Sequence, residues 1–326
     1  MNWPFGTRIR VRPSKPDAPG VYVTLDELVR LEFKARGVTF LPRQPVHSLL
    51  TGRHGSRMRG RGLNFEEIRG YLPGDDIRTI DWKVTARVRE PHVRVFTEER
   101  DRPAWLVVDQ RLAMFFGSKV SMKSVTAAHA AALGAWRVFA AGDRVGAVVF
   151  NDTESVEIRP HRSRRQVLRI LNTVLEQNHA LSASSTVETN PGQLNTALDA
   201  VVRRGRHGCL VVVISDFDGA DDRTRVLMNR LAERNDVIAV LVHDPMAREL
   251  PAGGRLLVSD GELQVTLDTA DGAVRERLLA QSTGRIQNIL DGQRTIGVPV
   301  LPISTAEDVA DQVRVLLGRA AQARRG

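Results

Sequence analysis

Two carboxylates stand directly after apolar segments that read as buried strands, and they are the residues of this sequence best suited to metal chemistry. Asp109 closes the segment WLVVD, and Asp216 closes CLVVVISD, with Asp218 two residues later. In parallel α/β sheets, ligands bind beyond the carboxyl ends of the strands. Carboxylate oxygens are the ligands that Mg²⁺ prefers in proteins. The pattern is compatible with a Mg²⁺ site, although aspartates at strand ends also form turns and helix caps.

A second dense group of charges lies between Gly60 and Glu99, in the stretch GRGLNFEEIRGYLPGDDIRTIDWKVTARVREPHVRVFTEE. Acids and arginines at this spacing form bidentate ion pairs, and aspartates here can cap turns or short helices. The stretch is either an ion-paired connector to the domain that follows or a dedicated binding surface. Its candidate interaction residues are Gly74, Asp75, Asp76, Arg78, Asp81 and Trp82.

The positive charge of the chain is concentrated near its start. The net charge is +9, and residues 1–62 hold twelve Lys and Arg against four Asp and Glu, which is a surplus of eight. Such a charge asymmetry favours binding to an acidic partner, a nucleic acid or a membrane surface. The alternative is that these charges form only a solvated face. The segment TGRHGSRMRGRG has no aromatic residues for base stacking. Its candidate basic patch consists of Arg53, Arg57, Arg59 and Arg61.

These residues must be positioned by alternating strands and helices. From Trp105 onward, near-continuous apolar strands separated by helical segments predict a doubly wound α/β fold with a mainly parallel sheet. Before it, the chain forms a mixed, charge-rich extension. The elements expected there are helices at 25–35 and 63–71 and a strand at 38–42. Those expected beyond the first strand include a hairpin within RLLVSDGELQVTL, a helix at 272–290 and a final helix capped by Ser304 and Glu307.

The remaining signals exclude several classes of protein. The single cysteine, Cys209, lies in an apolar run and is expected to be core packing rather than a nucleophile. The sequence contains neither a complete phosphate-binding loop nor an HExxH motif. It has no apolar signal segment at its start and no apolar run of membrane-spanning length, so a cytoplasmic location is expected.

Two resemblances add to this interpretation. The segments WLVVDQRLAMFFGS, GDRVGAVVF and ISDFDG resemble the core of a von Willebrand factor A-like domain. In that family the first strand ends in Asp-x-Ser-x-Ser, and these residues bind a divalent ion together with a later threonine and an Asp after the fourth strand. The upstream block with GDDIRTIDW resembles the signature of domain of unknown function family fifty-eight, which joins such a block to a von Willebrand factor A-like domain.

The sequence departs from the ion-binding pattern of the A-like family. Asp109 and Asp216 match two ligands, but Arg111 and Ala113 stand where the two serines are expected, and no hydroxyl matches the threonine. We expect a degenerate metal-ion-dependent adhesion site, with no cofactor rather than bound Mg²⁺. One hypothesis is that the Arg111 guanidinium lies between Asp109 and Asp216 and supplies the positive charge of the missing ion. The alternative is that Arg111 points to solvent.

The resemblances imply a domain division and a function. The expected parts are residues 1–102 with the basic arm and the charged block, residues 103–318 as the A-like domain, and a basic tail at 319–326. The implied function is that of a non-catalytic adaptor that works with a MoxR-type AAA+ ATPase and its client protein. The A-like domain would offer Arg111 and Asp218 as further interaction residues. Two alternatives stay open: nucleic-acid binding through the basic segment, and a metal-dependent hydrolase that uses Asp109 and Asp216.

Overall fold

The computed structural model describes residues 19–36, 63–98, 103–182, 185–205, 208–247, 255–259, 264–268 and 297–323. The chain divides into two compact units. The first consists of residues 1–40 and 102–326, and the second consists of residues 41–101. The charged block therefore lies in the second unit, and the two strand-end carboxylates lie in the first.

The first unit is built on a six-stranded sheet with the strand order β10-β7-β6-β3-β4-β5. All neighbouring strands are parallel except β5, which pairs antiparallel with β4 at one edge. The mainly parallel α/β sheet expected from the sequence is thus confirmed. The strands are β3 (Pro103–Asp109), β4 (Arg144–Phe150), β5 (Ser155–His161), β6 (Leu210–Ser215), β7 (Asp236–His243) and β10 (Val300–Ser304).

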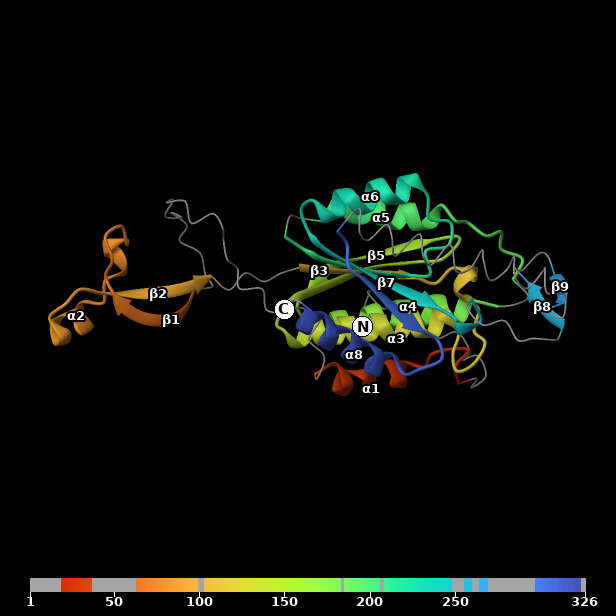
Figure 1. Ribbon diagram of the computed structural model, residues 1–326, viewed down its shortest axis with the longest axis horizontal. Coiled ribbons are helices and arrows are strands. Elements are labelled where there is room, and N and C mark those ends of the chain that lie inside the picture. The colour runs from red at the N-terminus through yellow and green to blue at the C-terminus, as the bar shows by residue number, and fades with distance from the viewer. Residues whose placement is uncertain are drawn as a thin grey trace, which may run out of the picture. The chain divides into compact units, whose positions relative to one another are not determined.

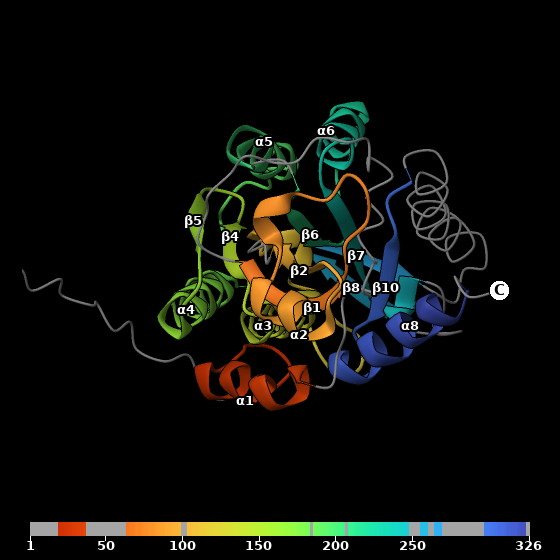
Figure 2. The same ribbon diagram turned by 90° about the vertical axis from the view of Figure 1, so that its left-hand side faces the viewer.

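Helices cover both faces of this sheet (Figures 1 and 2). On one face lie α5 (Gln193–Arg204) and α6 (Asp222–Ala232), and on the other lie α3 (Lys123–Ala140), α4 (Arg164–Ala180) and α8 (Val309–Ala323). The central strands are apolar along nearly their whole length because both of their faces are buried. The core under α5 and α6 includes Trp105, Phe150, Leu198 and Leu227.

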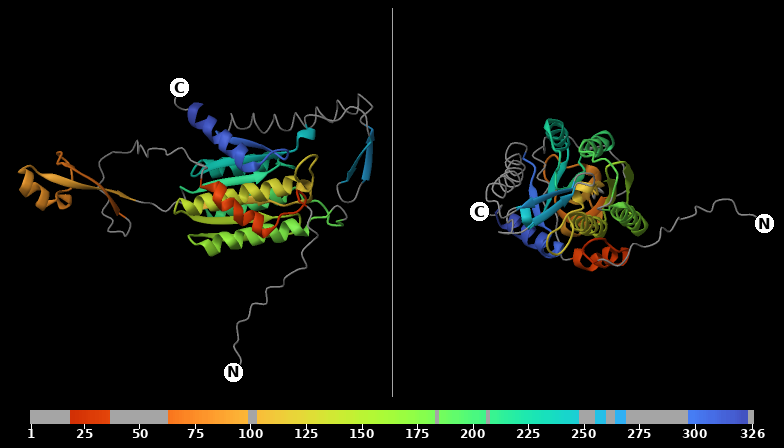
Figure 3. Two further views of the ribbon diagram at one scale, coloured as in Figure 1. Left: turned by 90° about the horizontal axis from the view of Figure 1, so that it is seen from below. Right: turned by 90° about the vertical axis from the view of Figure 1, so that its right-hand side faces the viewer.

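Helix α1 (Leu25–Ala35) belongs to the sheet unit and packs on α3 (Figure 3). It begins with the expected capping box of Thr24 and Glu27. Leu28 is fully buried, and its carbonyl accepts a hydrogen bond from Trp136 Nε1 at 3.0 Å. The sequence-based division, which put this helix together with the charged block in residues 1–102, therefore differs from the structure. Tertiary packing on α3 is the reason.

The second unit contains an antiparallel strand pair, β1 (Leu63–Gly70) and β2 (His92–Glu98), and the short helix α2 (Trp82–Val88). The strand predicted in HVRVFTEE is confirmed. The helix predicted at 63–71 is wrong, because this segment forms β1 and pairs along its length with β2. Pairing with a distant strand overrides the local preference of a segment with two glutamates.

The remaining predicted elements have different outcomes. The hairpin predicted in RLLVSDGELQVTL is confirmed as the antiparallel pair β8 (Arg255–Ser259) and β9 (Gln264–Asp268). Helix α8 begins at Val309, and Asp308 Oδ1 accepts hydrogen bonds from the backbone N–H groups of Ala310 and Asp311, so the predicted cap at Ser304 is wrong. The strand expected at 38–42 and the helix expected at 272–290 lie outside the described residues.

No helix in the described part of the chain combines the length and the apolar character needed to cross a membrane.

Candidate functional site

The two strand-end carboxylates lie at the same edge of the sheet. Asp109 is the last residue of β3, and Asp216 directly follows β6, which is the parallel neighbour of β3. This edge is where parallel α/β sheets bind their ligands. The candidate site is therefore built from the loops that follow these two strands.

Arg111 holds the Asp109 carboxylate in a buried, bidentate ion pair. Its Nε lies 3.0 Å from Oδ1 and its Nη2 lies 2.7 Å from Oδ2, and both side chains are essentially inaccessible to solvent. Complete burial raises the pKa of Asp109, and the charge of Arg111 opposes that shift. Burial alone would lower the pKa of Arg111, but the charges of Asp109, Asp216 and Asp152, with Asp109 the largest, together raise that pKa. Arg111 thus does not point to solvent.

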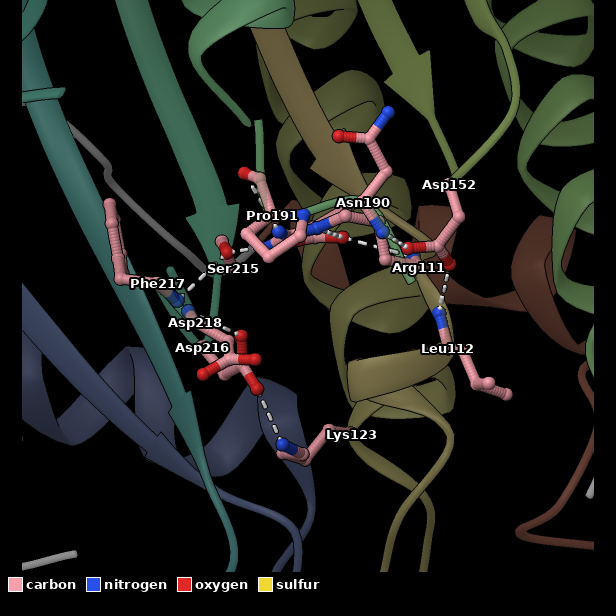
Figure 4. A network of polar contacts seen from close by, with 11 residues as sticks. Arg111, Leu112, Lys123, Asp152, Asn190, Pro191, Ser215, Asp216, Phe217 and Asp218 are labelled. Carbon is pink, nitrogen blue, oxygen red and sulfur yellow. Dashed lines mark hydrogen bonds and ion pairs between the residues drawn. The ribbon is translucent and has the colours of Figure 1, made fainter. Parts of the chain in front are cut away.

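Asp216 has a different cation. The ammonium group of Lys123, at the first position of α3, lies 2.5 Å from Asp216 Oδ2, as the dashed line in Figure 4 marks. Asp216 Oδ1 accepts a hydrogen bond from the Asp218 backbone N–H. Arg111 thus makes its direct contacts with Asp109, and Lys123 makes a direct contact with Asp216. The charge of Asp216 also helps to raise the pKa of Arg111, so the hypothesis that Arg111 supplies positive charge to both carboxylates stays a prediction.

A third strand-end carboxylate, Asp152, orders the loops around Arg111. It follows β4 and accepts hydrogen bonds from the backbone N–H groups of Leu112 at 2.6 Å and Asn190 at 2.8 Å (Figure 4). The next residue, Pro191, turns its carbonyl towards Arg111 Nη1 at 3.3 Å. Asp152 thus ties the loop after β3 to the loop before α5.

Ser215 completes the hydrogen bonding of Asp109. Its hydroxyl donates to Asp109 Oδ2 at 2.6 Å and accepts from the Phe217 backbone N–H at 2.8 Å, and the residue is fully buried. Phe217 has a positive φ of 54°, which is strained for a bulky side chain. Because the Ser215 hydroxyl is buried and engaged on both sides, it is not arranged as a nucleophile.

This donor set does not fit a divalent ion. Both Asp109 oxygens and one Asp216 oxygen already accept from cationic side chains that lie where a hard cation would have to bind. Among the residues that the structure describes, no group of three or more His, Cys, Asp or Glu side chains is arranged to hold a metal. The described side chains at this edge offer ion pairs and hydrogen bonds.

In the second unit, the aspartates of the charged block have internal roles. Arg69 forms a bidentate pair with Asp75, at 2.8 and 2.9 Å, and Arg94 Nε lies 2.7 Å from Asp81. The hydrogen bonds from these arginines lower the pKa of Asp75 and of Asp81. Asp81 also caps α2. The bidentate pairing expected from the sequence is present in this unit.

Other residues of the same block face the solvent. Asp76 accepts a hydrogen bond from the backbone N–H of Arg78, and the Arg78 side chain is exposed. Trp82, the first residue of α2, is 70% exposed. Gly74 has a φ of 110° in the turn before Asp75. Because their side chains are exposed, Arg78 and Trp82 can contact a partner directly.

Sequence reasoning missed Lys123, Asp152 and Ser215. A signal existed for Asp152, which follows an apolar strand as Asp109 and Asp216 do. The signal for Lys123 was weak. A cation at the start of a helix is disfavoured by the helix dipole, which indicates that a carboxylate neutralises it. The basic patch of Arg53, Arg57, Arg59 and Arg61 lies outside the described residues.

A family model described as "Protein of unknown function DUF58" matches residues 67–287. The chain is 31% identical over 292 residues to "Uncharacterized protein Rv1480" of Mycobacterium tuberculosis (strain ATCC 25618 / H37Rv), a match that covers 89% of this chain and 90% of the relative. It is 34% identical over 143 residues to "Uncharacterized protein MAV169" of Mycobacterium avium, which covers 41% of this chain and 84% of the relative.

Among solved structures, the crystal structure of conserved hypothetical protein BatB from Bacteroides thetaiotaomicron is similar at 12% sequence identity with a TM-score of 0.38. The match covers 68% of this chain and 99% of that chain.

Proposed function

Because the chain belongs to the family described as "Protein of unknown function DUF58", we propose that it is a non-catalytic adaptor. In this role it works with a MoxR-type AAA+ ATPase in the assembly or activation of client proteins. The resemblance of the GDDIRTIDW block and the strand-end aspartates to families with such partners supports the proposal.

The sheet unit, in this proposal, is a von Willebrand factor A-like domain. Its first strand, β3, ends in Asp109, and Asp216 follows β6, the fourth strand of the unit in chain order. These are the two positions that the A-like pattern assigns to aspartates. The mainly parallel sheet with an antiparallel edge strand and helices on both faces is compatible with this assignment.

The observation that carries the proposal is the pair of internal cations at the strand ends. Arg111 and Lys123 each neutralise one carboxylate, so the loops are ordered without an ion. The edge of the sheet then serves as a degenerate, metal-independent adhesion site. A partner meets it at the rim, where Asp218 is partly exposed.

The charged block supplies the second contact of the adaptor. A contiguous patch of exposed apolar side chains marks a surface that other proteins cover, and in this proposal the block presents such a patch. Leu72, Ile77 and Trp82 are 59, 66 and 70% exposed. Aromatic and arginine side chains dominate the binding energy of interfaces, so Trp82 and Arg78 are the residues whose loss weakens partner binding most.

Co-purification of the tagged full chain from its source cells, with and without Mg-ATP, tests the proposal. We expect an AAA+ ATPase to be recovered in a nucleotide-sensitive manner, and Trp82→Ala to reduce that recovery at least about tenfold. Phe33→Ala is the matched control, because Phe33 is an aromatic residue 72% exposed on α1, outside the block. Recovery of no AAA+ ATPase, or equal loss in both variants, contradicts the proposal.

A further inference from the structure

A second concave site lies at the opposite end of the strands from Asp109. It is a cleft of about 470 Å³, bordered by the amino ends of β3 and β4 and by the carboxyl ends of β5 and α5. This volume falls in the range of about 300–1,000 Å³ that is typical of small-molecule sites. None of its lining residues takes part in the contacts of the Asp109 site.

Arginines dominate the polar lining of this cleft. Arg144, Arg159, Arg203 and Arg204 reach it from β4, β5 and α5, and within the described residues no carboxylate is among the lining side chains. The arginines on α5 have acidic neighbours outside the lining, since Arg203 pairs with Asp199 at 3.1 Å and Arg204 pairs with Glu157. These two are also the basic residues in the last turn of α5, where cations are favoured by the helix dipole.

Arg159 differs from Arg203 and Arg204 in its surroundings. Its side chain is exposed on β5, and no ion pair of its guanidinium with another described residue is present. Its carbonyl accepts a hydrogen bond from Gln166 Nε2 at 2.6 Å, which fixes the backbone that carries it. A solvent-facing guanidinium at the mouth of an arginine-lined cleft is available to a ligand without breaking an internal pair.

The rest of the lining is apolar. It consists of Pro103, Trp105, Pro160 and Cys209, and Trp105 is only 3% exposed because most of its ring belongs to the core. A site of this composition suits a ligand with a compact anionic group and a flat or apolar body. It does not suit an extended polymer, because the arginines converge on a cleft instead of following a surface.

We propose that this cleft binds the phosphate group of a small phosphomonoester, with Arg159 as the principal ligand of the phosphate and the other lining arginines adding positive charge around it. A guanidinium matches the oxygens of phosphate in a planar, bidentate manner. A phosphate monoester carries nearly two negative charges at neutral pH and offers three acceptor oxygens, so it accepts from guanidinium groups on different elements at once. A carboxylate offers one charge and two oxygens and satisfies fewer of them.

Isothermal titration of the full chain at a pH of about 8, where the phosphate is dianionic, tests this proposal with three probes. Phenyl phosphate carries the dianion on a flat ring, inorganic phosphate lacks the ring, and benzoate has the ring with a single charge. We expect phenyl phosphate to bind more tightly than inorganic phosphate. Benzoate, with one charge fewer, is expected to bind at least about tenfold more weakly than phenyl phosphate, which corresponds to about 1.4 kcal/mol.

Variants then assign the binding to the cleft. Arg159→Gln is expected to weaken phenyl phosphate binding at least about tenfold, the loss of one charge-assisted hydrogen bond. Arg230→Gln, which removes an exposed arginine on α6 outside the cleft, is the matched control and is expected to leave binding unchanged. The proposal is overturned if neither phosphate gives saturable heat, if benzoate binds as tightly as phenyl phosphate, or if both variants bind like the wild type.

Discussion

Lys123 holds its ammonium group 2.5 Å from the Asp216 carboxylate although it is the first residue of α3. The amino end of a helix carries a partial positive charge and disfavours a cation. The ion pair with Asp216 therefore offsets the unfavourable position of a cation at the amino end of α3. The same pair neutralises the Asp216 carboxylate with a lysine in place of a bound ion. A parallel pairing of Arg111 with Asp109 lies on the neighbouring strand.

Removing Arg111 alone is expected to destabilise the protein strongly. Arg111→Met leaves Asp109 buried without its cation, which costs about 3–5 kcal/mol of unfolding free energy. The double variant Asp109→Asn with Arg111→Met removes both charges and should be less destabilised than the single variant. Urea unfolding followed by circular dichroism measures both, and equal stability of Arg111→Met and the wild type would contradict the role of the pair.

The wild type is expected to give no saturable heat with Mg²⁺ or Mn²⁺, because Arg111 and Lys123 occupy the carboxylates. The triple variant Arg111→Ser, Ala113→Ser and Lys123→Met exchanges the two cations for hydroxyl and apolar groups and should gain Mg²⁺ binding. Calorimetric titration measures this, and Asp109→Ala in the triple variant should abolish the gain. Micromolar Mg²⁺ binding by the wild type that vanishes in Asp109→Ala would refute the metal-independent site.

Gly219 is expected to tolerate a methyl group less well than Gly208. Both have a positive φ, of 70° and 79°, so alanine pays a similar backbone cost of about 1 kcal/mol at each. A Cβ at Gly219 would stand 2.3 Å from the Pro191 Cβ, whereas a Cβ at Gly208 meets nothing within 4 Å. Because the Pro191 carbonyl accepts from Arg111, Gly219→Ala also disturbs the site.

Thermal unfolding of the two glycine variants makes that comparison. Gly219→Ala should lose more stability than Gly208→Ala, by about 1–3 kcal/mol for the forced shift of packed atoms. Equal losses would mean that the loop carrying Gly219 moves away from Pro191 without cost.

Asp244 is expected to make stability depend on pH in acid. Burial alone would raise its pKa, but hydrogen bonds from Ser118 and Thr305 outweigh that effect and hold the pKa below its usual value of 3.8. The unfolded state therefore binds a proton more readily than the folded state. The stabilisation is present above a pH of about 3.8 and is lost as the pH falls through the lower folded pKa.

The variant Asp244→Asn tests that dependence. It should be less stable than the wild type at neutral pH, by about 1–3 kcal/mol, and the difference should shrink in acid below the usual pKa of aspartate. Thermal unfolding across a pH series measures the difference. Asp222→Asn is the control, because the Asp222 side chain is 93% exposed. A stability difference between Asp244→Asn and the wild type that grows in acid would contradict the predicted sign.

The packing of α1 on α3 gives a prediction for the N-terminal helix. Leu28 is fully buried, so Leu28→Ala should cost about 2–5 kcal/mol. Phe33→Ala on the same helix removes a mostly exposed ring and should change stability by less than about 0.5 kcal/mol. Denaturant unfolding compares the two variants. A small effect of Leu28→Ala would mean that α1 is not part of the sheet unit.

The sequence was most informative where local pattern and tertiary role agree. The strands ending at Asp109 and Ser215 could be predicted because both of their faces are buried, which leaves a nearly continuous apolar run. The segment at 63–70 could not, because its partner strand at 92–98 decides its conformation and lies beyond any local window.

The same division holds for the candidate site. Arg111 could be identified because it is two residues from Asp109 and occupies a position where a serine is expected. Lys123 could not, since it lies 93 residues before Asp216 in the chain, and only the packing of α3 on the sheet brings the two together. Asp152 acts through backbone N–H groups, which no side-chain motif records.

The insertion of residues 41–101 between α1 and the strands of its own unit has a consequence for biosynthesis. Helix α1 ends at Ala35, but α3, on which it packs, is complete only at Ala140. At about 5–20 residues per second, the ribosome takes about 5–20 s to make the intervening chain. Throughout that interval Leu28 and Leu31 have no native surface to cover them, so the nascent chain is most open to chaperones and to misassembly before α3 emerges.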